Sequence, residues 1–482
     1  MNGMHVKKWM MLALILNAIY LVWLIPHIQG WQGVVFYGAE VGLISSLVLS
    51  AVCLWNRPYT QKNPKPLTDK PWVDIFVTCY NEPKAMIEKT LLAATWIRYQ
   101  KKKIFVLDDG HRKEIKKLAK KYHVKYISRK DPIDAKAGNL NNAMQYTNSP
   151  FILILDADHV TEPTILDDLL PYFGNSQRIA YITTKQRFDV HEQDFNNDHL
   201  FYNYMQSSKN VDGCAISTGS GVIYRRSAIE EIGGFATWNM VEDLTTSYTL
   251  NQHGFKSIYI NKPYTTGLAP QDLKNIYKQR GTWAVDTLRL FFHANPLLAK
   301  KLTWRQRLHY LEMCWSYIVS AIFIPMLFAF PVLSLFTNFP FVEAGFEYIL
   351  FRAPGAIATI ALFGTLNRGF ENNQFWIGMW PVYLKSIFLA LRKKKMQYKV
   401  TEKLEAHGRR VRLILPQLTL FGLGILGIVY NLAVYGFTEL TYVNSMWIAI
   451  EAWWVHPIIL YGLAKQRRHI PTIHKSVHGS YA

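Results

Sequence analysis

FILILDADHV, residues Phe151–Val160, joins a continuous apolar run of strand length to two carboxylates, Asp156 and Asp158, separated by one residue. Because side chains alternate faces along a strand, both carboxylates can point the same way where the strand ends. Two hard oxygen ligands side by side suit Mg²⁺ or Mn²⁺ carrying a diphosphate. A strand followed by a solvated acidic turn is the plainer interpretation of a lone pair of this kind. The rest of the chain decides between them.

The composition indicates a membrane protein. The chain has 482 residues, a formal charge of +20 and 50% hydrophobic residues, which predicts several parts and a membrane or anionic partner. Apolar runs of spanning length predict about six transmembrane helices. These runs lie at Trp9–Pro26, Gly33–Trp55, His309–Phe336, Phe346–Leu366, Val411–Phe437 and Ser445–Leu463.

Lysine and arginine crowd one set of flanks of these runs and are absent from the opposite loops. By the positive-inside rule, we expect both termini and the long segment between the second and third runs on the cytoplasmic side of the plasma membrane. Topology then explains much of the charge, and a nucleic-acid partner is not expected. Arg352 is an exception, expected near the outer interface or inside the bundle. The first run lacks a cleavage pattern and predicts an uncleaved anchor.

Four scattered cysteines predict neither a disulfide framework nor a zinc site. Between about Lys70 and His293, strand-like segments alternate with helical ones, which predicts an α/β layer with a mainly parallel sheet. The expected strands are Val73–Thr78, Lys103–Leu107, Val124–Ile127, Phe151–Leu155 and Ile179–Thr183, and the expected helices include Pro83–Arg98 and Ala135–Tyr146.

Polar residues follow three of these strands, and ligands of such sheets bind beyond the carboxyl ends of the strands. Tyr80, Asn81 and Glu82 follow the first strand, Asp108 and Asp109 the second, and Asp156 ends the fourth. We therefore expect these side chains to converge on one crevice.

The helix that begins near Asp134 carries Lys136, Asn139 and Asn141. Its amino-terminal dipole and Lys136 favour a phosphate group, although a capped helix start is also an ordinary structural feature.

Two later segments are also candidates. Ser217–Gly221, STGSG, is a small-residue turn that lets the backbone approach a ligand closely. Glu242 and Asp243 begin a helix, where they either cap it or deprotonate a hydroxyl nucleophile. Arg280 offers charge to a leaving diphosphate and Trp283 offers a flat face to a sugar, although membrane anchoring explains this pair equally well.

The order of these motifs resembles the processive, membrane-embedded family 2 glycosyltransferases, and is most similar to the bacterial cellulose synthase catalytic subunit. The motifs that carry the resemblance are Tyr80-Asn81-Glu82, Asp108-Asp109-Gly110, Lys136 to Asn141, Asp156-Ala157-Asp158, Val241-Glu242-Asp243 and Gln279 to Trp283. The resemblance implies a GT-A-like cytosolic α/β domain inserted in a helical membrane bundle.

The resemblance also implies roles for single residues. The nucleotide sugar is expected to contact Tyr80, Glu82, Asp108, Asp109, Lys136, Asn139, Asp156, Gln279 and Arg280. Asp156 and Asp158 would hold the metal, Mg²⁺ or Mn²⁺. Asp243 would be the general base, with Glu242 beside it as the second catalytic residue. The acceptor glycan would meet Thr218, Gly219, Ser220 and Trp283.

Near the carboxyl terminus, Tyr398–Lys403 resembles the family's gating loop, with Tyr398, Val400, Thr401 and Lys403 in the motif. It follows Gln374–Lys395, an amphipathic segment expected to lie in the membrane interface as a helix.

The chain also departs from the family pattern. Thr282 replaces an arginine of the QxxRW box, and Ser217 to Ser220 replace the FFCGS turn. The segment after the last apolar run is too short for a PilZ domain, so control by cyclic di-GMP through this chain is not expected.

These assignments divide the chain into five expected parts. Residues 1–65 hold two transmembrane helices, 66–300 the glycosyltransferase domain, 301–370 two further transmembrane helices, 371–410 the interfacial helix and gating-like loop, and 411–482 the last two transmembrane helices with a short tail.

The leading hypothesis is inverting transfer of a sugar, expected to be glucose, from a UDP-sugar to a growing extracellular β-glucan or capsule-like polysaccharide, which the same protein translocates. Candidates to line its path are Trp315, Tyr317, Trp447, Glu451, Trp453 and Trp454, although an aromatic belt explains many of them equally well.

Two alternatives stay open: a non-processive transferase that acts on a lipid carrier, and a nucleotide-gated transporter. The sugar, the linkage, the acceptor and any accessory or homo-oligomeric subunit also stay open.

Overall fold

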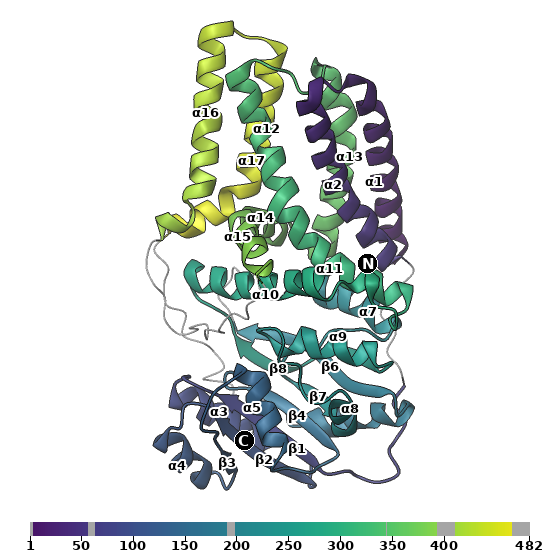
Figure 1. The fold of residues 1–482 in the computed structure, drawn as a ribbon, viewed down its shortest axis with the longest axis vertical. Coiled ribbons are helices and arrows are strands. Elements are labelled where there is room, and N and C mark those ends of the chain that lie inside the picture. Colours follow the sequence, from purple (N-terminus) through teal and green to yellow (C-terminus); the bar gives the residue numbers. More distant parts are fainter. Residues whose placement is uncertain (1–2, 56–62, 190–197, 344, 393–409, 465–482) are drawn as a thin grey trace.

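The computed structural model of the chain consists of an α/β domain beside a bundle of long helices (Figure 1). It describes residues 3–55, 63–189, 198–343, 345–392 and 410–464. Within these ranges, six helices are long and apolar enough to cross a membrane: Val6–His27, Gly30–Leu54, Trp304–Thr337, Gly345–Asn367, Leu415–Tyr435 and Glu439–Leu463. The prediction of about six spans is confirmed, and the chain is a multi-pass membrane protein.

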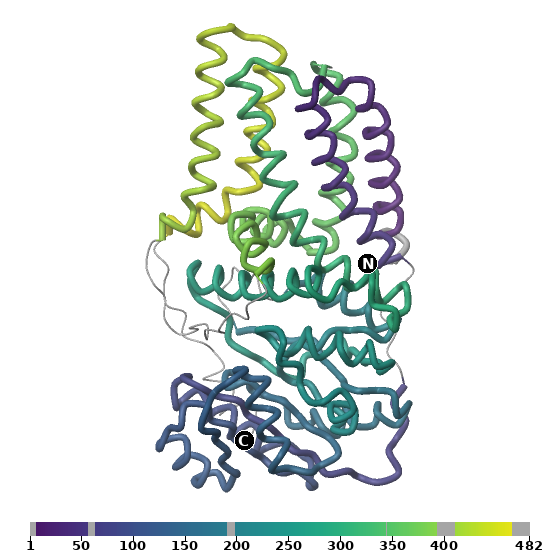
Figure 2. The backbone as a smooth tube through the Cα atoms, viewed as in Figure 1, coloured from purple at the N-terminus to yellow at the C-terminus, as the bar shows by residue number. Residues whose placement is uncertain are grey.

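The spans belong to two groups of helices, which the ribbon and the backbone trace both show (Figures 1 and 2). α1 (Gly3–Leu24) packs on α2 (Gly30–Leu54) and on α13 (Gly345–Asn367). α12 (Ile324–Thr337) packs on α16 (Leu415–Tyr435) and α17 (Glu439–Leu463).

The third span is built from two helices. α11 (Trp304–Ile318) joins α12 through a π-helical turn at Val319–Phe323. Pro325 lies in the first turn of α12 and has no N–H to donate to the preceding turn, so the regular helical bonding is interrupted there.

The α/β domain contains one mixed sheet. Its strands are β1 (Val73–Cys79), β2 (Lys102–Asp108), β3 (Lys125–Ile127), β4 (Phe151–Asp156), β5 (Val160–Thr161), β6 (Ile179–Asp189), β7 (Val222–Arg225) and β8 (Lys256–Leu268). Their order is β3-β2-β1-β4-β7-β6-β8-β5.

The first four strands run parallel, as the sequence predicts, and β6 also runs parallel to β8. β7 instead runs antiparallel to β4 and β6, and β5 antiparallel to β8. The segment between α7 (Gln206–Val211) and β7 reaches the sheet where β4 ends, since Gly221 N donates to the carbonyl of Ile154, and β7 runs back along β4 from there. Four of the seven neighbouring strand pairs are parallel and three are antiparallel, so the prediction of a mainly parallel sheet is confirmed by a narrow margin.

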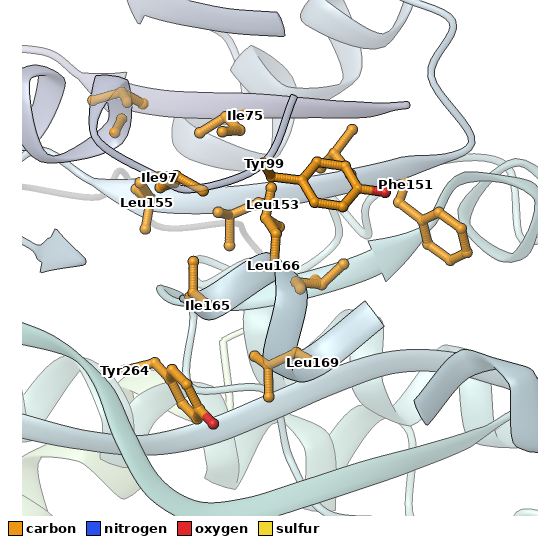
Figure 3. Close-up of a cluster of buried hydrophobic side chains, with 14 of the residues drawn as sticks. Ile75, Ile97, Tyr99, Phe151, Leu153, Leu155, Ile165, Leu166, Leu169 and Tyr264 are labelled. Carbon is orange, nitrogen blue, oxygen red and sulfur yellow. The ribbon is translucent and has the colours of Figure 1, made fainter. Parts of the chain in front are cut away.

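The central strands are apolar because both of their faces are covered. Every residue of β1 is buried, and its side chains alternate between two core clusters, with Ile75 in one and Phe76 in the other. Figure 3 shows the first cluster, in which Ile75 and Leu153 pack with Ile165 and Leu166. Burial on both faces explains the continuous apolar run that precedes Asp156.

The helices between the second and third spans are α3 (Lys84–Thr95), α4 (Lys113–Lys121), α5 (Ala135–Met144), α6 (Ile165–Leu169), α7, α8 (Arg226–Glu231), α9 (Glu242–Gln252) and α10 (Leu273–His293). The predicted helices at Pro83 and Ala135 are confirmed, but each ends two or three residues earlier than expected. α10 lies between the α/β domain and the bundle (Figure 1).

The expectation of one helix over Gln374–Lys395 is wrong in the described part. The chain forms α14 (Glu371–Gly378) and α15 (Trp380–Ala390), which meet at Met379. Pro381 in the first turn of α15 explains the break, since it cannot donate the bond that would continue α14. Residues 393–409, with the gating-like motif at Tyr398, Val400, Thr401 and Lys403, lie outside the described residues.

Candidate active site

Two carboxylates and an imidazole gather where β4 ends. Ligand atoms of Asp156, Asp158 and His159 lie within 4.8 Å of one another. Asp158 is buried, and its carboxylate accepts from Leu268 N at 3.2 Å and lies 3.3 Å from Nδ1 of His159. The side chain of Asp156 is 32% exposed, so this group opens to the crevice through Asp156.

The donor set fits a divalent cation. Carboxylate oxygens suit Mg²⁺ and Mn²⁺, and an imidazole nitrogen can complete such a site. Nε2 of His159 is buried without a hydrogen-bond partner among the described residues, and a Cβ at Gly267 would collide with the imidazole ring. The sequence analysis missed His159, although its place directly after Asp158 was a usable signal.

Lys136 connects the end of β4 to the helix that carries the predicted base. Its Nζ lies 2.7 Å from Oδ1 of Asp156 and 2.8 Å from Oε1 of Glu242, and it donates to the carbonyl of Gly219 at 2.7 Å. Burial disfavours the ammonium, but the two carboxylates outweigh burial and raise the pKa of Lys136 well above its usual value. Lys136 is therefore a cation held between three segments of the site.

Two strained residues precede Lys136. Asp134 and Ala135 have φ angles of 64° and 45°, in the left-handed region that L-residues rarely adopt. Arg129 supports this turn, since it donates to the carbonyls of Ile133 and Ala135. Such strain persists where the surroundings fix it, and here it directs the start of α5 into the crevice.

Asp243 lies at the start of α9 with the properties of a general base at neutral pH. Burial, and then the neighbouring Glu242 carboxylate, raise the pKa of Asp243 to about 7, and the Lys136 ammonium opposes this shift. Leu244 N donates to Oδ1 of Asp243 at 2.6 Å. A carboxylate with such a pKa can accept a proton at neutral pH.

The turn at Ser217–Gly221 lies against Asp243. Gly219 has φ +78°, and a Cβ there would come within 3.1 Å of Oδ2 of Asp243, so the backbone approaches the carboxylate closely. Ser220 is fully buried, and its Oγ accepts from Asp156 N at 3.0 Å. Thr218 lies 3.1 Å from Thr183, hydroxyl to hydroxyl, and lines the adjoining cavity. Thr218 and Gly219 are therefore placed to meet a ligand, whereas Ser220 holds the turn.

Asp286 of α10 positions the segment before the base. Its buried carboxylate accepts from Met240 N at 3.1 Å and from Val241 N at 2.7 Å, which are the residues directly before Glu242. Burial raises the pKa of Asp286 well above its usual value. The sequence analysis missed this residue, because a bond from α10 to the start of α9 leaves no local pattern.

The residues predicted to contact the nucleotide lie at the ends of β1 and β2. Tyr80 is 40% exposed. Asp108 is fully buried and accepts from Arg112 and Tyr126, and Asp109 pairs with Arg129 through two contacts of 2.8 Å.

Two further predicted contacts, Glu82 and Asn139, differ in their surroundings. Glu82 accepts from Tyr80 N at 2.6 Å, and burial raises its pKa. Asn139 is buried and donates to the carbonyl of Leu107 at 3.1 Å. Tyr80 is therefore the most open of these side chains, and Asp108 and Asn139 mainly hold their own loops.

α10 carries the last predicted group. The Arg280 guanidinium lies 5.1 Å from the Trp283 ring centroid, and both residues line the cavity beside Asp243. Gln279 has a buried side-chain oxygen without a partner among the described residues. Thr282 donates to the carbonyl of Lys278 at 2.9 Å in its own helix, so it supplies no charge in place of the missing arginine.

A cavity of about 1270 Å³ extends from these residues into the helix bundle. It begins at Asp243 and Trp283 and passes Glu40, Arg352 and Glu451. Tyr317, Trp447, Trp453 and Trp454 also line it. The described lining does not include Trp315. Its indole N–H donates to Ser45 Oγ of α2 at 2.8 Å.

The expectation that Arg352 lies inside the bundle or near the outer interface is confirmed. The guanidinium is buried and pairs with Glu40 at 2.9 Å. The cavity therefore joins the proposed base to charged groups at membrane depth.

Comparison with known proteins finds two families. The profile described as "Glycosyltransferase like family 2" matches residues 71–285, and the profile described as "Cellulose synthase" matches residues 229–378. Cellulose synthase 1 catalytic subunit (UDP-forming) of Komagataeibacter xylinus is 29% identical over 452 residues, which cover 88% of this chain and 60% of that protein. The UDP-forming catalytic subunit of Pseudomonas fluorescens is 32% identical over 322 residues, which cover 62% of this chain and 43% of that protein.

The chain thus spans between about two fifths and three fifths of the length of these two relatives. Among solved structures, a mannosyltransferase from Pyrobaculum calidifontis in complex with GDP-Man and Mn²⁺ matches with a TM-score of 0.55 and 17% identity, over 79% of this chain and 100% of that one. This similarity concerns the fold, and the predicted GT-A-like fold is confirmed.

Proposed function

We propose, on the premise that residues 71–285 belong to the glycosyltransferase-like family 2 and residues 229–378 to the cellulose synthase family, that this chain is a membrane-embedded processive glycosyltransferase. In this proposal it transfers a sugar from a UDP-sugar to a growing glycan and passes the glycan outward through its own helix bundle. The whole activity is proposed, since the chain spans only part of its relatives.

One observation carries the proposal: Asp243, with a pKa near 7, lies at the mouth of a cavity that continues into the membrane bundle. Lys136 joins the same helix start to Asp156 through contacts of 2.7 and 2.8 Å. A base and a diphosphate-binding group are therefore adjacent to a passage large enough for a glycan. A transporter with a nucleotide-sensing domain has no use for a base at this position.

The reaction assigned to the site is an inverting displacement. The acceptor hydroxyl oxygen forms a bond to the anomeric carbon of the donor sugar, while the bond from that carbon to the diphosphate oxygen breaks and UDP leaves. Asp243 takes the proton of the hydroxyl, and the configuration at the anomeric carbon inverts because attack comes from the face opposite the leaving group.

Asp156, Asp158 and His159 are the residues assigned to hold a divalent cation, Mg²⁺ or Mn²⁺, which would neutralise charge on the departing diphosphate. Lys136 and Arg280 are the cations assigned to add positive charge near that diphosphate. Nucleotide contacts are assigned to Tyr80, and acceptor contacts to the ring of Trp283 and to Thr218.

Glucose is the proposed sugar and β-glucan the proposed product, because the relatives with about 30% identity are UDP-forming cellulose synthases. We also propose that both termini and the catalytic domain face the cytoplasm, which agrees with the basic flanks of the spans. A capsule-like role belongs to the same proposal.

The experiment supplies purified protein with UDP-glucose, UDP-N-acetylglucosamine, UDP-galactose and UDP-glucuronate, each with Mg²⁺ or Mn²⁺. We expect UDP release with UDP-glucose and a ladder of products that linkage-specific β-glucanases digest. The Asp243→Asn protein is the control and should make no ladder. A single sugar on a lipid would favour the non-processive transferase, and the absence of UDP release with every donor would contradict the proposal.

A further inference from the structure

Several residues of α13 and α17 that line the cavity are also exposed, which indicates an opening between the two helices. On α17, Ile448 packs toward Gly424 of α16, whereas Ala449 and Trp453, about 100° and 140° further round the helix, are exposed. Ala449 and Trp453 nevertheless line the cavity. A cavity enclosed by α12, α16 and α17 alone could not reach that side of α17.

The surface of α13 that faces α17 also contains residues that line the cavity, one of which is exposed. Ala356 and Ile360 line the cavity, and so does Ile357, which lies one residue further round the helix and is 63% exposed. Ala358, next along, packs toward α1 and is buried. The opening is therefore apolar, and it lies at mid-span on both helices.

Aromatic contacts close both ends of this opening. At the outer end, Phe346 packs on Tyr442 with ring centroids 5.1 Å apart. At the cytosolic end, Phe370 packs on Trp453 at 5.8 Å. Between them, Ala353 to Ile360 cover roughly 10 Å of helix axis. A transmembrane helix must extend over about 30 Å, so it cannot enter an opening that is closed above and below. A hydrocarbon chain can.

Cations gather below the opening, at the cytosolic end of α13. Arg368 follows the last residue of α13 and is exposed. Burial and the nearby Arg368 guanidinium lower the pKa of Lys185. Burial, with Arg368 and Lys185, also lowers the pKa of His199, although its bond to the Leu366 carbonyl and the Asp198 carboxylate oppose this shift. His199 also contacts the carbonyl of Leu366 at 2.8 Å, which ties this group to α13. Like charges that disfavour one another in this way would be stabilised by a bound anion.

We propose that an anionic membrane phospholipid binds here, with its phosphate at Arg368 and Lys185 and one acyl chain in the opening between α13 and α17. Cationic side chains below an apolar opening at membrane depth are complementary to the phosphate and the acyl chain of such a lipid. The inference concerns a binding site outside the catalytic crevice, and lipid binding itself does not depend on glycosyl transfer.

The bound chain would complete the wall of the cavity. If the proposed function is right, a glycan passing Glu451 carries hydroxyl groups that cannot make hydrogen bonds with hydrocarbon, and exposing them to the bilayer through an open wall is costly. This consequence rests on the proposed function.

The test uses the full-length protein in nanodiscs of phosphatidylcholine and phosphatidylglycerol with a phosphatidylglycerol probe that carries a diazirine in its acyl chain. We expect photolabelled peptides from α13 and α17. The Arg368→Gln and Lys185→Gln double variant should lose labelling by at least fivefold, since each cation near the surface favours an anionic lipid by about that factor. Ile357→Trp, which fills the opening from an exposed position, should lower labelling without loss of folding.

Arg412→Gln is the matched control, because Arg412 is an exposed cation at the foot of α16, away from the opening. It should label like the unchanged protein. Equal labelling by a phosphatidylcholine probe, or equal labelling of the double variant, would overturn the proposal. So would a polyprenyl phosphate as the lipid that copurifies, because the site would then serve a carrier. None of these readouts requires turnover, so failure of the proposed transferase would leave them interpretable.

Discussion

The crevice at the end of β4 and the cavity in the helix bundle both contain buried charge, but they stabilise it differently. In the crevice, Lys136 contacts both Asp156 and Glu242 within 2.8 Å, beside Asp243. In the bundle, Glu40 pairs with Arg352 but keeps one buried carboxylate oxygen without a partner, and Glu451 has no ion-pair partner among the described residues. A dense charge network tunes a reactive group, whereas separated charges leave room for something to pass.

This difference predicts that substitutions in the crevice stop sugar transfer, whereas substitutions in the bundle affect only the passage of the glycan or the stability of the protein. In the crevice, the carboxylates and Lys136 are coupled, so a change at one alters the protonation of the next. In the bundle, Glu40 and Arg352 are coupled as one ion pair, and Glu451 has no part in that pair. The predictions below test this contrast, from the largest expected effect to the smallest.

The sharpest contrast is between Asp243→Asn and Glu451→Gln. Loss of the base should lower single-turnover sugar transfer by roughly 10² to 10⁴-fold, because general base catalysis contributes about that factor. Glu451→Gln is nearly isosteric and should leave single turnover unchanged. Rapid-quench measurement of UDP release, with donor affinity measured in parallel, separates rate from binding. A near-normal rate for Asp243→Asn would remove it from the mechanism.

Asp158→Asn should lower the rate by about 10²-fold, since a divalent cation contributes several kcal/mol of charge stabilisation at a leaving diphosphate. Adding a chelator to the unchanged protein should lower the rate in the same way, and restoring Mg²⁺ or Mn²⁺ should reverse it. Calorimetric titration of Mn²⁺ provides the direct readout. Unchanged Mn²⁺ affinity in Asp158→Asn would contradict the assigned ligand set.

Arg352→Leu tests the bundle side of the comparison. Removing the guanidinium leaves Glu40 as an uncompensated buried charge, which should lower the free energy of unfolding by about 3 kcal/mol. The paired Arg352→Leu and Glu40→Leu variant should recover most of that loss, because neither charge then remains. Thermal unfolding in detergent measures both proteins. If the single and double variants unfold alike, the pair is not what stabilises this part of the bundle.

The pH dependence of the rate tests the crevice side with the smallest effect. Because Asp243 must be deprotonated to accept a proton and its pKa is about 7, the rate should fall about tenfold per pH unit below 7 and level off above it. Glu242→Gln removes a carboxylate that raises the pKa of Asp243, so the falling part of the pH–rate profile should move to lower pH. If the Glu242→Gln protein loses activity at the same pH as the unchanged protein, the two carboxylates are not coupled.

The sequence was most informative for structural features that one continuous segment determines. The apolar run before Asp156 predicted a strand, which the structure shows to be buried on both faces, and run length predicted the spans. His159 lies next to Asp158 and was open to prediction from position alone. The break at Pro381 was also open to prediction, because proline cannot continue a helix.

The remaining features depend on contacts between distant segments. Lys136 was expected at the nucleotide, but its three contacts come from β4, α9 and the turn at Gly219, which only the folded chain brings together. Asp286 holds the start of α9 from α10, and nothing near Asp286 in the sequence indicates that bond. The direction of β7 likewise depends on where Gly221 meets Ile154, a contact between distant segments.

The most direct test of the central claim follows the product in sealed proteoliposomes that contain the purified protein and receive radiolabelled UDP-glucose with Mg²⁺ from outside. If chemistry in the crevice feeds the cavity in the bundle, molecules with their catalytic domain outside should release UDP outside and accumulate polymer inside, protected from added β-glucanase. Polymer that stays outside and is fully digested would contradict the coupling of the two regions, and a product of one sugar per lipid would contradict processive synthesis.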